Sequence, residues 1–259
     1  MAAEETARTA ALLADSYDGE SAASIAGRFG LPGVHLYASV GSTMDAAHAL
    51  GEAGAPAGTV VLADAQTAGR GRQGRSWRSA PARGIWLTVL ERPTDASGLE
   101  VLSLRAGLAA AGALDRFTAA PVQVKWPNDL FVAGGKVAGV LVEARWRGLR
   151  PDWVAIGLGV NVRPPRDVPG AGGLREGTSR IDVLTCLVPA LRVAATRRGA
   201  LDMRELSEYA ARDYARGRRC LTPVRGIVAG ITAVGELAVR TPHGVEHYRA
   251  GSLVLEGGA

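Results

Sequence analysis

A glycine- and arginine-rich segment at residues 66–77 restricts the fold more than any other part of the chain. It lies between two stretches of β-branched and aliphatic residues, 59–63 and 85–90, that are typical of strands. Its glycines match the G-x-G-x-x-G fingerprint of dinucleotide-binding folds: Gly69, Gly71 and Gly74. That fingerprint needs a helix to begin at the loop, so that its N–H groups meet a pyrophosphate. Here a strand follows and no Gly-Lys-Ser/Thr is present, so the sequence excludes a Rossmann loop and a P-loop.

The arginines of this segment indicate a loop that binds anions. Arg70, Arg72 and Arg75 can each hold a phosphate or carboxylate in a bidentate fashion. The glycines between them let the loop fold over a bound anion, and Trp77 offers a flat face for a purine ring. Taken alone, the segment is also compatible with a solvated arginine-rich loop or a short nucleic-acid contact.

A second segment places a lysine at the start of an apolar strand. Residues 125–130 read Lys-Trp-Pro-Asn-Asp-Leu, and a hairpin turn at 133–135 returns the chain as a strand over 136–144. Strict alternation of side chains would put Lys136 and Gly139 on opposite faces of that strand. A lysine at a strand end is commonly just an exposed charge, and an Asn-Asp pair is commonly just a turn.

The remaining pattern predicts a mixed α and β domain followed by a small β domain. Residues 1–33 are rich in alanine and predict short helices, and residues 99–117 predict a buried helix. From residue 218 onward, short β-branched stretches alternate with glycine turns, which is typical of a small β-barrel. The predicted division is an N-terminal helical extension at 1–33, a main domain at 34–216 and a C-terminal domain at 217–259.

Composition narrows the class of protein. Apolar residues make up 47% of the 259, which is enough for a sizeable core, and the net charge of +5 suits anionic partners. The two cysteines, Cys186 and Cys220, lack the CxxC spacing of metal sites, so we expect reduced thiols. Neither a secretory leader nor a membrane-spanning apolar run is legible, and we therefore expect a soluble, cytoplasmic protein.

Together these segments resemble the biotin–protein ligase family. The resemblance rests on Gly41-Ser42-Thr43, then the Gly-Arg segment with Trp77, then Lys125-Trp126-Pro127-Asn128-Asp129 with Lys136 to Glu143, in the family's order and approximate spacing. It covers roughly residues 37–255 and includes the strand that ends at Asn161. It implies an α+β catalytic domain related to class II aminoacyl-tRNA synthetases, with a mixed, largely antiparallel sheet flanked by helices and an SH3-like C-terminal barrel.

The resemblance implies a two-step reaction. The carboxylate of biotin attacks the α-phosphate of ATP, which releases pyrophosphate and gives biotinyl-5′-AMP; a lysine of a biotin carboxyl carrier domain then displaces AMP. Mg²⁺ accompanies ATP, and no metal bound tightly by protein side chains is expected. Only about 35 residues precede the first motif, so we expect the family's short form, without a DNA-binding domain and without DNA or membrane partners. Homodimers occur in the family.

Roles for individual residues follow from the same resemblance. Arg72 and Lys136 would screen the carboxylate from the phosphate, and Asp129 would orient or deprotonate the incoming lysine. The residues implied to bind biotin are Ser42, Thr43, Met44, Gln66, Arg70, Gly71, Arg72, Lys136 and Gly139. Those implied to bind the nucleotide are Gly69, Arg72, Arg75, Trp77, Asn128, Lys136 and Asn161. Met44 departs from the family, which commonly has Asn or Asp after Gly-Ser-Thr.

Two other functions compete with this interpretation. A lipoate or octanoate ligase shares the superfamily, but such enzymes resemble the chain less in the Gly-Arg loop and in the Lys-Trp-Pro-Asn-Asp segment. A non-catalytic RNA- or biotin-binding module is the second alternative. Aromatic residues are few and scattered, which disfavours RNA binding. The presence of both Arg72 and Lys136 disfavours a biotin binder without turnover.

Overall fold

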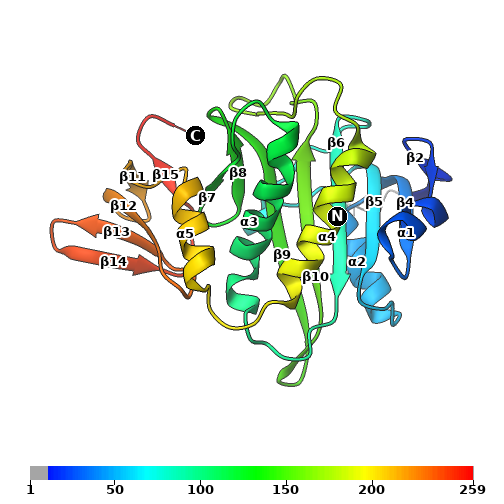
Figure 1. Cartoon of the computed structure of the whole chain (residues 1–259), viewed down its shortest axis with the longest axis horizontal. Helices are drawn as coiled ribbons and strands as arrows, with labels where there is room; N and C mark the ends of the chain where they lie inside the picture. Colours follow the sequence, from blue (N-terminus) through cyan, green and yellow to red (C-terminus); the bar gives the residue numbers. More distant parts are fainter. Residues whose placement is uncertain (1–10, 259) are drawn as a thin grey trace, which may run out of the picture.

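The computed structural model describes residues 11–258 and consists of a large mixed sheet with helices and a smaller C-terminal sheet (Figure 1). In spatial order, the eight strands of the main sheet are β1 (Leu12–Leu13), β4 (Val34–Val40), β5 (Thr59–Gln66), β6 (Gly84–Glu91), β10 (Arg150–Asn161), β9 (Gly135–Arg147), β8 (Asp129–Val132) and β7 (Gln123–Lys125). Strands β4 and β5 run parallel, and the other neighbours pair antiparallel. The predicted mixed, largely antiparallel sheet is confirmed.

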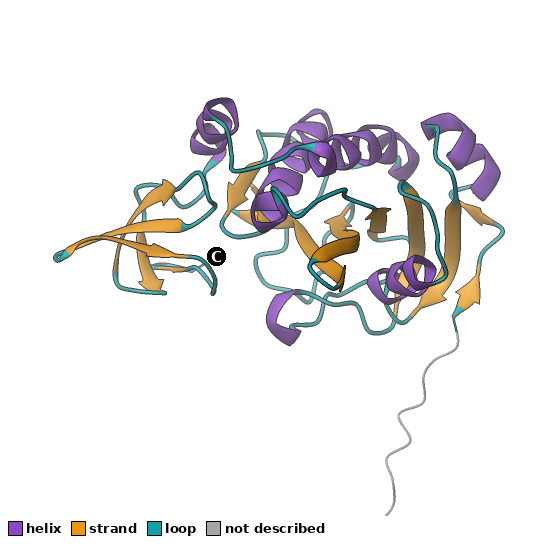
Figure 2. Cartoon of the chain, turned by 90° about the horizontal axis from the view of Figure 1, so that it is seen from below, coloured by secondary structure: helices purple, strands orange, loops and turns teal. Residues whose placement is uncertain are grey.

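Helices cover both faces of this sheet (Figure 2). Helices α3 (Leu102–Leu114) and α4 (Arg180–Thr196) lie side by side on one face, and α2 (Thr43–Glu52) lies on the other. Alternation along β5 explains this: Val60 and Leu62 belong to the core under α3 and α4, whereas Val61 packs with Met44 and Ala47 of α2. Because both faces are covered, the central strands are apolar nearly throughout. No helix in the described part of the chain is long and apolar enough to cross a membrane.

The N-terminal segment differs from the predicted helices. Strand β1 pairs with β4, and β2 (Ser16–Tyr17) and β3 (Glu20–Ser21) form a hairpin before the single helix α1 (Ala22–Phe29). An Asp-Gly turn with positive φ at both residues, Asp18 and Gly19, favours this hairpin. Arg180 of α4 fixes it by pairing with Asp18 and by lying 4.3 Å from the ring centroid of Tyr17. Residues 1–10 of the predicted extension lie outside the described residues.

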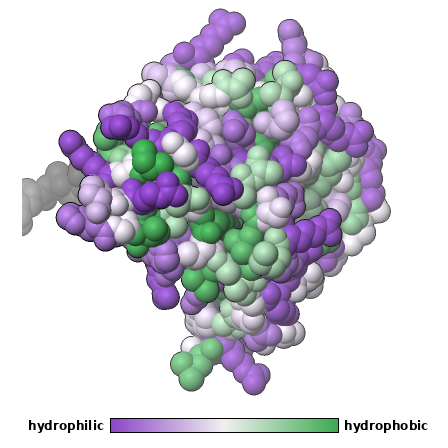
Figure 3. All heavy atoms as spheres, turned by 60° about the vertical axis from the view of Figure 1, so that its left-hand side comes forward, coloured by the Kyte–Doolittle hydropathy of each residue, from purple (hydrophilic) through white to green (hydrophobic). Residues whose placement is uncertain are grey.

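The C-terminal sheet is antiparallel and lies beside the main sheet (Figure 1). Its strands, in spatial order, are β14 (Gly244–Tyr248), β13 (Leu237–Thr241), β12 (Gly226–Ile231), β11 (Arg219–Thr222) and β15 (Val254–Leu255). The Trp126 indole N–H donates to the carbonyl of Gly235 at 3.0 Å, and the Leu201 N–H donates to that of Ala233 at 2.8 Å. Apolar residues lie among hydrophilic ones on the face that this sheet presents (Figure 3).

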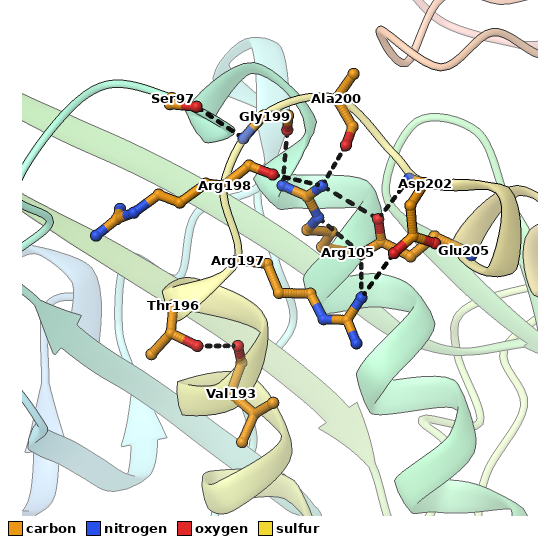
Figure 4. A network of polar contacts seen from close by, with 10 residues as sticks. All are labelled: Ser97, Arg105, Val193, Thr196, Arg197, Arg198, Gly199, Ala200, Asp202 and Glu205. Atoms are coloured by element: carbon orange, nitrogen blue, oxygen red, sulfur yellow. Dashed lines mark hydrogen bonds and ion pairs between the residues drawn. The ribbon is translucent and has the colours of Figure 1, made fainter.

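A buried ion pair joins the main domain to α5 (Met203–Arg212), the helix that precedes the C-terminal sheet (Figure 4). Arg105 of α3 is 3% exposed and contacts both carboxylate oxygens of Glu205, at 2.8 and 3.1 Å. Its other N–H groups donate to the carbonyls of Gly199 at 3.0 Å and Ala200 at 2.7 Å. Asp202 caps α5 in a reciprocal capping box with Glu205. The guanidinium is thus paired and hydrogen-bonded, as a buried charge requires.

Candidate functional site

A cavity of about 690 Å³ opens on the face of the main sheet that carries α2. Its walls are the start of α2, the Gly-Arg loop (residues 69–77), the segment 125–129 and residues 251–254 of the C-terminal region. The predicted site residues that line it are Ser42, Thr43, Met44, Gln66, Arg70, Gly71, Arg72, Arg75, Trp77, Asn128, Asp129, Lys136 and Gly139. The structure therefore brings together residues from five separate stretches of sequence.

A second cavity, of about 960 Å³, adjoins the first and shares Gln66, Ser76, Trp77 and Trp86 with it. The two predicted site residues that the first cavity lacks, Gly69 and Asn161, line this second one. Several arginines surround it: Arg78, Arg83, Arg163 and Arg166. Trp77 lines both cavities, so a ligand could extend from one to the other past the indole.

One end of the first cavity is lined by buried polar groups. Ser42 accepts the Met44 N–H at 3.3 Å as the N-cap of α2. The N–H and hydroxyl of Thr43 donate to Oε1 of Gln66 at 2.8 and 3.1 Å, and the Thr88 hydroxyl donates to Thr43 at 2.9 Å. The Met44 side chain packs closely over Gly157, where a Cβ would lie 2.8 Å from the Cε of Met44. This end suits a small, rigid ring with polar edges.

Two glycines make room for Trp77 on the floor of the cavity. Gly139 of β9 and Gly159 of β10 face each other in register. A Cβ on Gly159 would lie 2.6 Å from Cε2 of the indole, and a Cβ on Gly139 would lie 3.1 Å from Cζ3. The indole N–H is buried without a hydrogen-bond partner among the described residues. Gly159 was not predicted as a site residue, since its role depends on a partner 82 positions away, Trp77.

Gly159→Ala is therefore expected to displace the Trp77 ring and destabilise the fold by about 1–3 kcal/mol through overpacking. Thermal unfolding and a shift in the tryptophan emission spectrum would measure the two effects. Gly27→Ala in α1 is the matched control, since a Cβ there meets nothing within 4 Å and the helix gains stability. An unchanged melting temperature and spectrum for Gly159→Ala would contradict this packing.

A β-bulge brings Lys136 and Gly139 to the same face of β9. The register runs from Leu130 opposite Ala138 to Phe131 opposite Lys136, so β9 contributes one extra residue, Val137. Lys136 then contacts Asp129 at 2.7 Å and lies 5.1 Å from the centroid of the Trp77 ring, over the cavity floor. The prediction of opposite faces is wrong, because it assumed an unbroken two-residue period.

The middle of the cavity is rich in positive charge. Arg72, Arg75, Lys125 and Lys136 all line it, with Asp129 as the carboxylate among them. Burial lowers the pKa of Arg72, with Asp129 opposing the shift and Arg75 adding to it. Burial also lowers the pKa of Lys125, which is 7% exposed, and the cations nearby lower it further. A bound anion would relieve this repulsion. Lys125 was missed as a site residue, although it begins the Lys-Trp-Pro-Asn-Asp motif.

Three of the predicted side chains are engaged with the protein itself. The Arg70 guanidinium pairs with Asp45 at 2.8 Å and lies 3.5 Å from Glu143, so two carboxylates share its charge. Asn128 donates to the carbonyl of Val140 at 2.6 Å. Asn161 donates to the carbonyl of Lys136 at 3.2 Å. Both amides therefore hold β9 in place beside the cavity.

Within residues 11–258, no group of three His, Cys, Asp or Glu side chains could hold a metal ion. Cys186 and Cys220 are free thiols, as the sequence predicted. The residues that line the first cavity offer cations, amides and hydroxyls, with the Asp129 carboxylate among them. Such an arrangement can bind a small polar ring at one end and a phosphate or carboxylate in the middle.

Comparisons with known proteins show the family of the chain. The model of the biotin/lipoate A/B protein ligase family matches residues 36–161. The chain is 34% identical to the biotin–[acetyl-CoA-carboxylase] ligase of Paracoccus denitrificans over 215 residues, covering 77% of this chain and 84% of that protein. It is 38% identical to the bifunctional ligase/repressor BirA of Bacillus subtilis over 150 residues, covering 55% of this chain and 46% of that protein. It thus spans about half the length of the Bacillus relatives.

Solved structures share the same architecture. The biotin protein ligase from Aquifex aeolicus in complex with biotin and ATP superimposes with a TM-score of 0.71 and 26% sequence identity. The match covers 86% of this chain and 98% of that one, and so includes strands of both sheets. On the strength of the matched motifs, the Paracoccus relative and this shared fold, the chain belongs to the biotin/lipoate A/B protein ligase family.

Proposed function

We propose that this chain is a biotin–protein ligase that makes biotinyl-5′-AMP from biotin and MgATP and transfers biotin to a lysine of a biotin carboxyl carrier domain. One observation carries the proposal: a single cavity joins a polar end to a cluster of cations around Asp129. The name of the Paracoccus relative supports biotin as the acyl substrate. The Aquifex complex, which holds biotin and ATP on the same fold, supports the pair of small-molecule substrates.

Biotin would lie with its ureido ring at the polar end and its carboxylate among the cations. Ser42, Thr43 and Gln66 offer hydroxyl, amide and backbone groups to the ring, and Met44 offers an apolar wall to its sulfur-containing side. The backbone of the Gly-Arg loop at Arg70 and Gly71 would cover the ring. The valeryl chain would cross the floor beside Gly139 and end near Lys136. This placement puts the apolar valeryl chain over an apolar floor and the carboxylate beside cations. Both contacts are favourable.

The nucleotide would lie across Trp77. Its α-phosphate would meet Arg72, Arg75 and Lys136, which line the cavity with Asp129 as the one carboxylate among the described residues of its lining. Its base would lie against the indole toward the second cavity, where Gly69 and Asn161 form part of the wall. Asn128, through its bond to β9, would keep the floor beneath the phosphate in place. Mg²⁺ would enter as part of the MgATP substrate, bound by its phosphates.

The cations then serve the first step by lowering the repulsion between two anions. The biotin carboxylate oxygen attacks the α-phosphorus, the bond to the bridging oxygen breaks, and pyrophosphate leaves. Lys136 and Arg72 stabilise the charge that builds on the phosphate oxygens. In the second step the carrier lysine attacks the acyl carbon and AMP leaves. Asp129, held by Lys136 at 2.7 Å, would orient the amine and take up its proton.

We also propose the setting of this reaction. The separate C-terminal sheet supports a domain boundary near residue 216, and residues 217–259 would form the family's SH3-like domain. The free thiols of Cys186 and Cys220 are consistent with a reducing compartment, which supports a cytoplasmic enzyme. A homodimer, as occurs in the family, is testable by light scattering.

The direct test is mass spectrometry of a biotin carboxyl carrier domain after incubation with this chain, biotin and MgATP. We expect the carrier to gain one biotinyl group, and biotinyl-AMP to form when the carrier is omitted. Lipoate in place of biotin is the matched control and should give no comparable acyl-adenylate. Formation of lipoyl-AMP without biotinyl-AMP would overturn the proposal in favour of a lipoate ligase.

A further inference from the structure

A line of polar contacts leads from the body of the protein to the Gly-Arg loop, and the reaction proposed above does not use it. Its members, in order, are Trp153 of β10, His48 of α2, Glu143 of β9, Arg70 of the loop and Asp45 of α2. The successive donor–acceptor distances are 3.0, 2.9, 3.5 and 2.8 Å. Of these residues, Arg70 alone lines the cavity.

The inner end of this line fixes the position of Glu143. An indole N–H can only donate, so Nδ1 of His48 accepts from Trp153 and the ring proton lies on Nε2. That N–H donates to Glu143 Oε2. Burial lowers the pKa of His48. Arg145 and Arg70 lower this pKa further, whereas Glu143 raises it. The lowered pKa and the hydrogen bond from Trp153 both favour a neutral ring. His48 is 5% exposed and has no freedom to turn away.

The outer end fixes the loop. The loop is closed on itself, since the Gly71 N–H donates to the carbonyl of Arg75 at 2.7 Å and the Trp77 N–H donates to that of Gly69 at 2.8 Å. These two hydrogen bonds and the Arg70 contacts hold the loop in its present shape, so we expect loss of an Arg70 contact to expose both amides more often to exchange. Glu143 is 26% exposed and Asp45 is 60% exposed, so the Glu143 contact, although longer, is less screened by water.

We propose that Arg70 is a positioning residue that fastens the Gly-Arg loop over the bound acyl-adenylate, with Glu143 and Asp45 as its anchors and His48 as the group that holds Glu143 in place. This inference rests on the proposed function. It separates two tasks within one loop: Arg72 meets the anion, whereas Arg70 determines how long the loop stays shut. A mixed anhydride is open to water, so a shut loop protects the intermediate until the carrier arrives.

The first experiment needs no substrate. Amide hydrogen exchange of residues 69–77 is compared between the wild-type chain, Glu143→Gln and Arg147→Gln. Arg147 is the matched control, because it belongs to the same strand, pairs with Asp152 at 2.8 Å and is 84% exposed. We expect the Gly71 and Trp77 amides to exchange about fivefold faster in Glu143→Gln and at the wild-type rate in Arg147→Gln. Equal rates in all three proteins would overturn the inference.

Variants of His48 test the inner end. His48→Gln keeps an N–H that can donate to Glu143, whereas His48→Leu does not. We expect faster loop exchange in the leucine variant and near wild-type exchange in the glutamine variant. The variants are compared with wild type under conditions that give equal melting temperatures, with a stabilising osmolyte added where needed. If the leucine variant does not fold, Asp45→Asn supplies the second measurement, with a smaller increase expected at its more exposed contact. Loop exchange equal to wild type in every anchor variant would overturn the proposal.

The second experiment uses the enzyme with biotin and MgATP. Preformed biotinyl-AMP complex is chased with unlabelled ligand, and single-turnover adenylation is measured in parallel. For Glu143→Gln we expect release about fivefold faster and adenylation within about twofold of wild type. A loss of adenylation as large as the gain in release would assign Arg70 and its anchors to catalysis and overturn the inference. If the wild-type chain makes no biotinyl-AMP, the proposed function fails, and the exchange measurement still decides whether Arg70 fastens the loop.

Discussion

Arg105→Ala is expected to lower the free energy of unfolding by about 3–5 kcal/mol, the range seen when one partner of a buried ion pair is removed. Glu205 is 7% exposed and would keep a charge with its main partner gone. The carbonyls of Gly199 and Ala200 would lose their donors as well. Denaturant unfolding, with the midpoint and slope fitted separately, measures the loss.

The free energy of unfolding that is lost in Arg105→Ala depends on pH. The Arg105 hydrogen bond and the capping N–H of Asp202 hold the pKa of Glu205 below its ordinary value, against the effect of burial. A carboxyl with a lowered pKa in the folded state stabilises the protein above its unfolded pKa and loses that contribution as the pH falls. The gap between wild type and Arg105→Ala should therefore narrow below about pH 4.5.

Two controls make this test specific. Arg197 is 42% exposed and also contacts Glu205, at 3.5 Å, so Arg197→Ala should cost less than about 1 kcal/mol. The double replacement Arg105→Met with Glu205→Leu removes both charges and should recover most of the lost stability. A cost below about 1 kcal/mol for Arg105→Ala would show that the pair contributes no more than a surface contact does.

Lys136→Ala is expected to slow the formation of biotinyl-AMP by at least ~100-fold while leaving the fold intact. Its side chain is 33% exposed, so little packing is lost. Its removal takes away the cation that pairs with Asp129 at 2.7 Å, beside the place where biotin and phosphate would meet. The biotin carboxylate and the α-phosphate would then meet beside the negative charge of Asp129. Rapid-quench measurement of the first turnover, with labelled biotin and MgATP, gives the rate.

The matched control for Lys136→Ala again replaces an arginine on the same strand. Arg147→Ala removes a cation from the far end of β9, where no cavity wall lies, and adenylation should be unchanged. Equal first-turnover rates for Lys136→Ala and wild type would remove Lys136 from the proposed chemistry. A slower second step alone would instead point to a role through Asp129.

Much of this architecture is legible in the sequence because it depends on local pattern. The apolar stretches at 59–63 and 85–90 became adjacent strands β5 and β6, and the glycine and arginine spacing between them became a loop over a cavity. A strand after the loop was sufficient to exclude a dinucleotide-binding turn. Motifs in fixed order identified the family, which the Paracoccus relative then showed.

The features that the sequence did not show depend on how one segment pairs with another. The bulge at Val137 depends on where β8 pairs with β9, and no pattern within β9 reveals it. The hairpin at residues 16–21 depends in part on Arg180, far along the chain, although its Asp-Gly turn was a local signal that could have been used. Arg70 seemed free to bind an anion because Glu143 and Asp45 become its neighbours only after folding.

The cavity wall contributed by residues 251–254 has a consequence for the order in which a ribosome makes this protein. Ser42 is synthesised 210 residues before Ser252, yet both line one cavity, and Arg75 of the loop hydrogen-bonds to Ser252. Domains fold as they emerge, so the main sheet can form while this wall is still in the exit tunnel. A nascent chain would then hold the polar end of the cavity before residues 251–254 complete its wall.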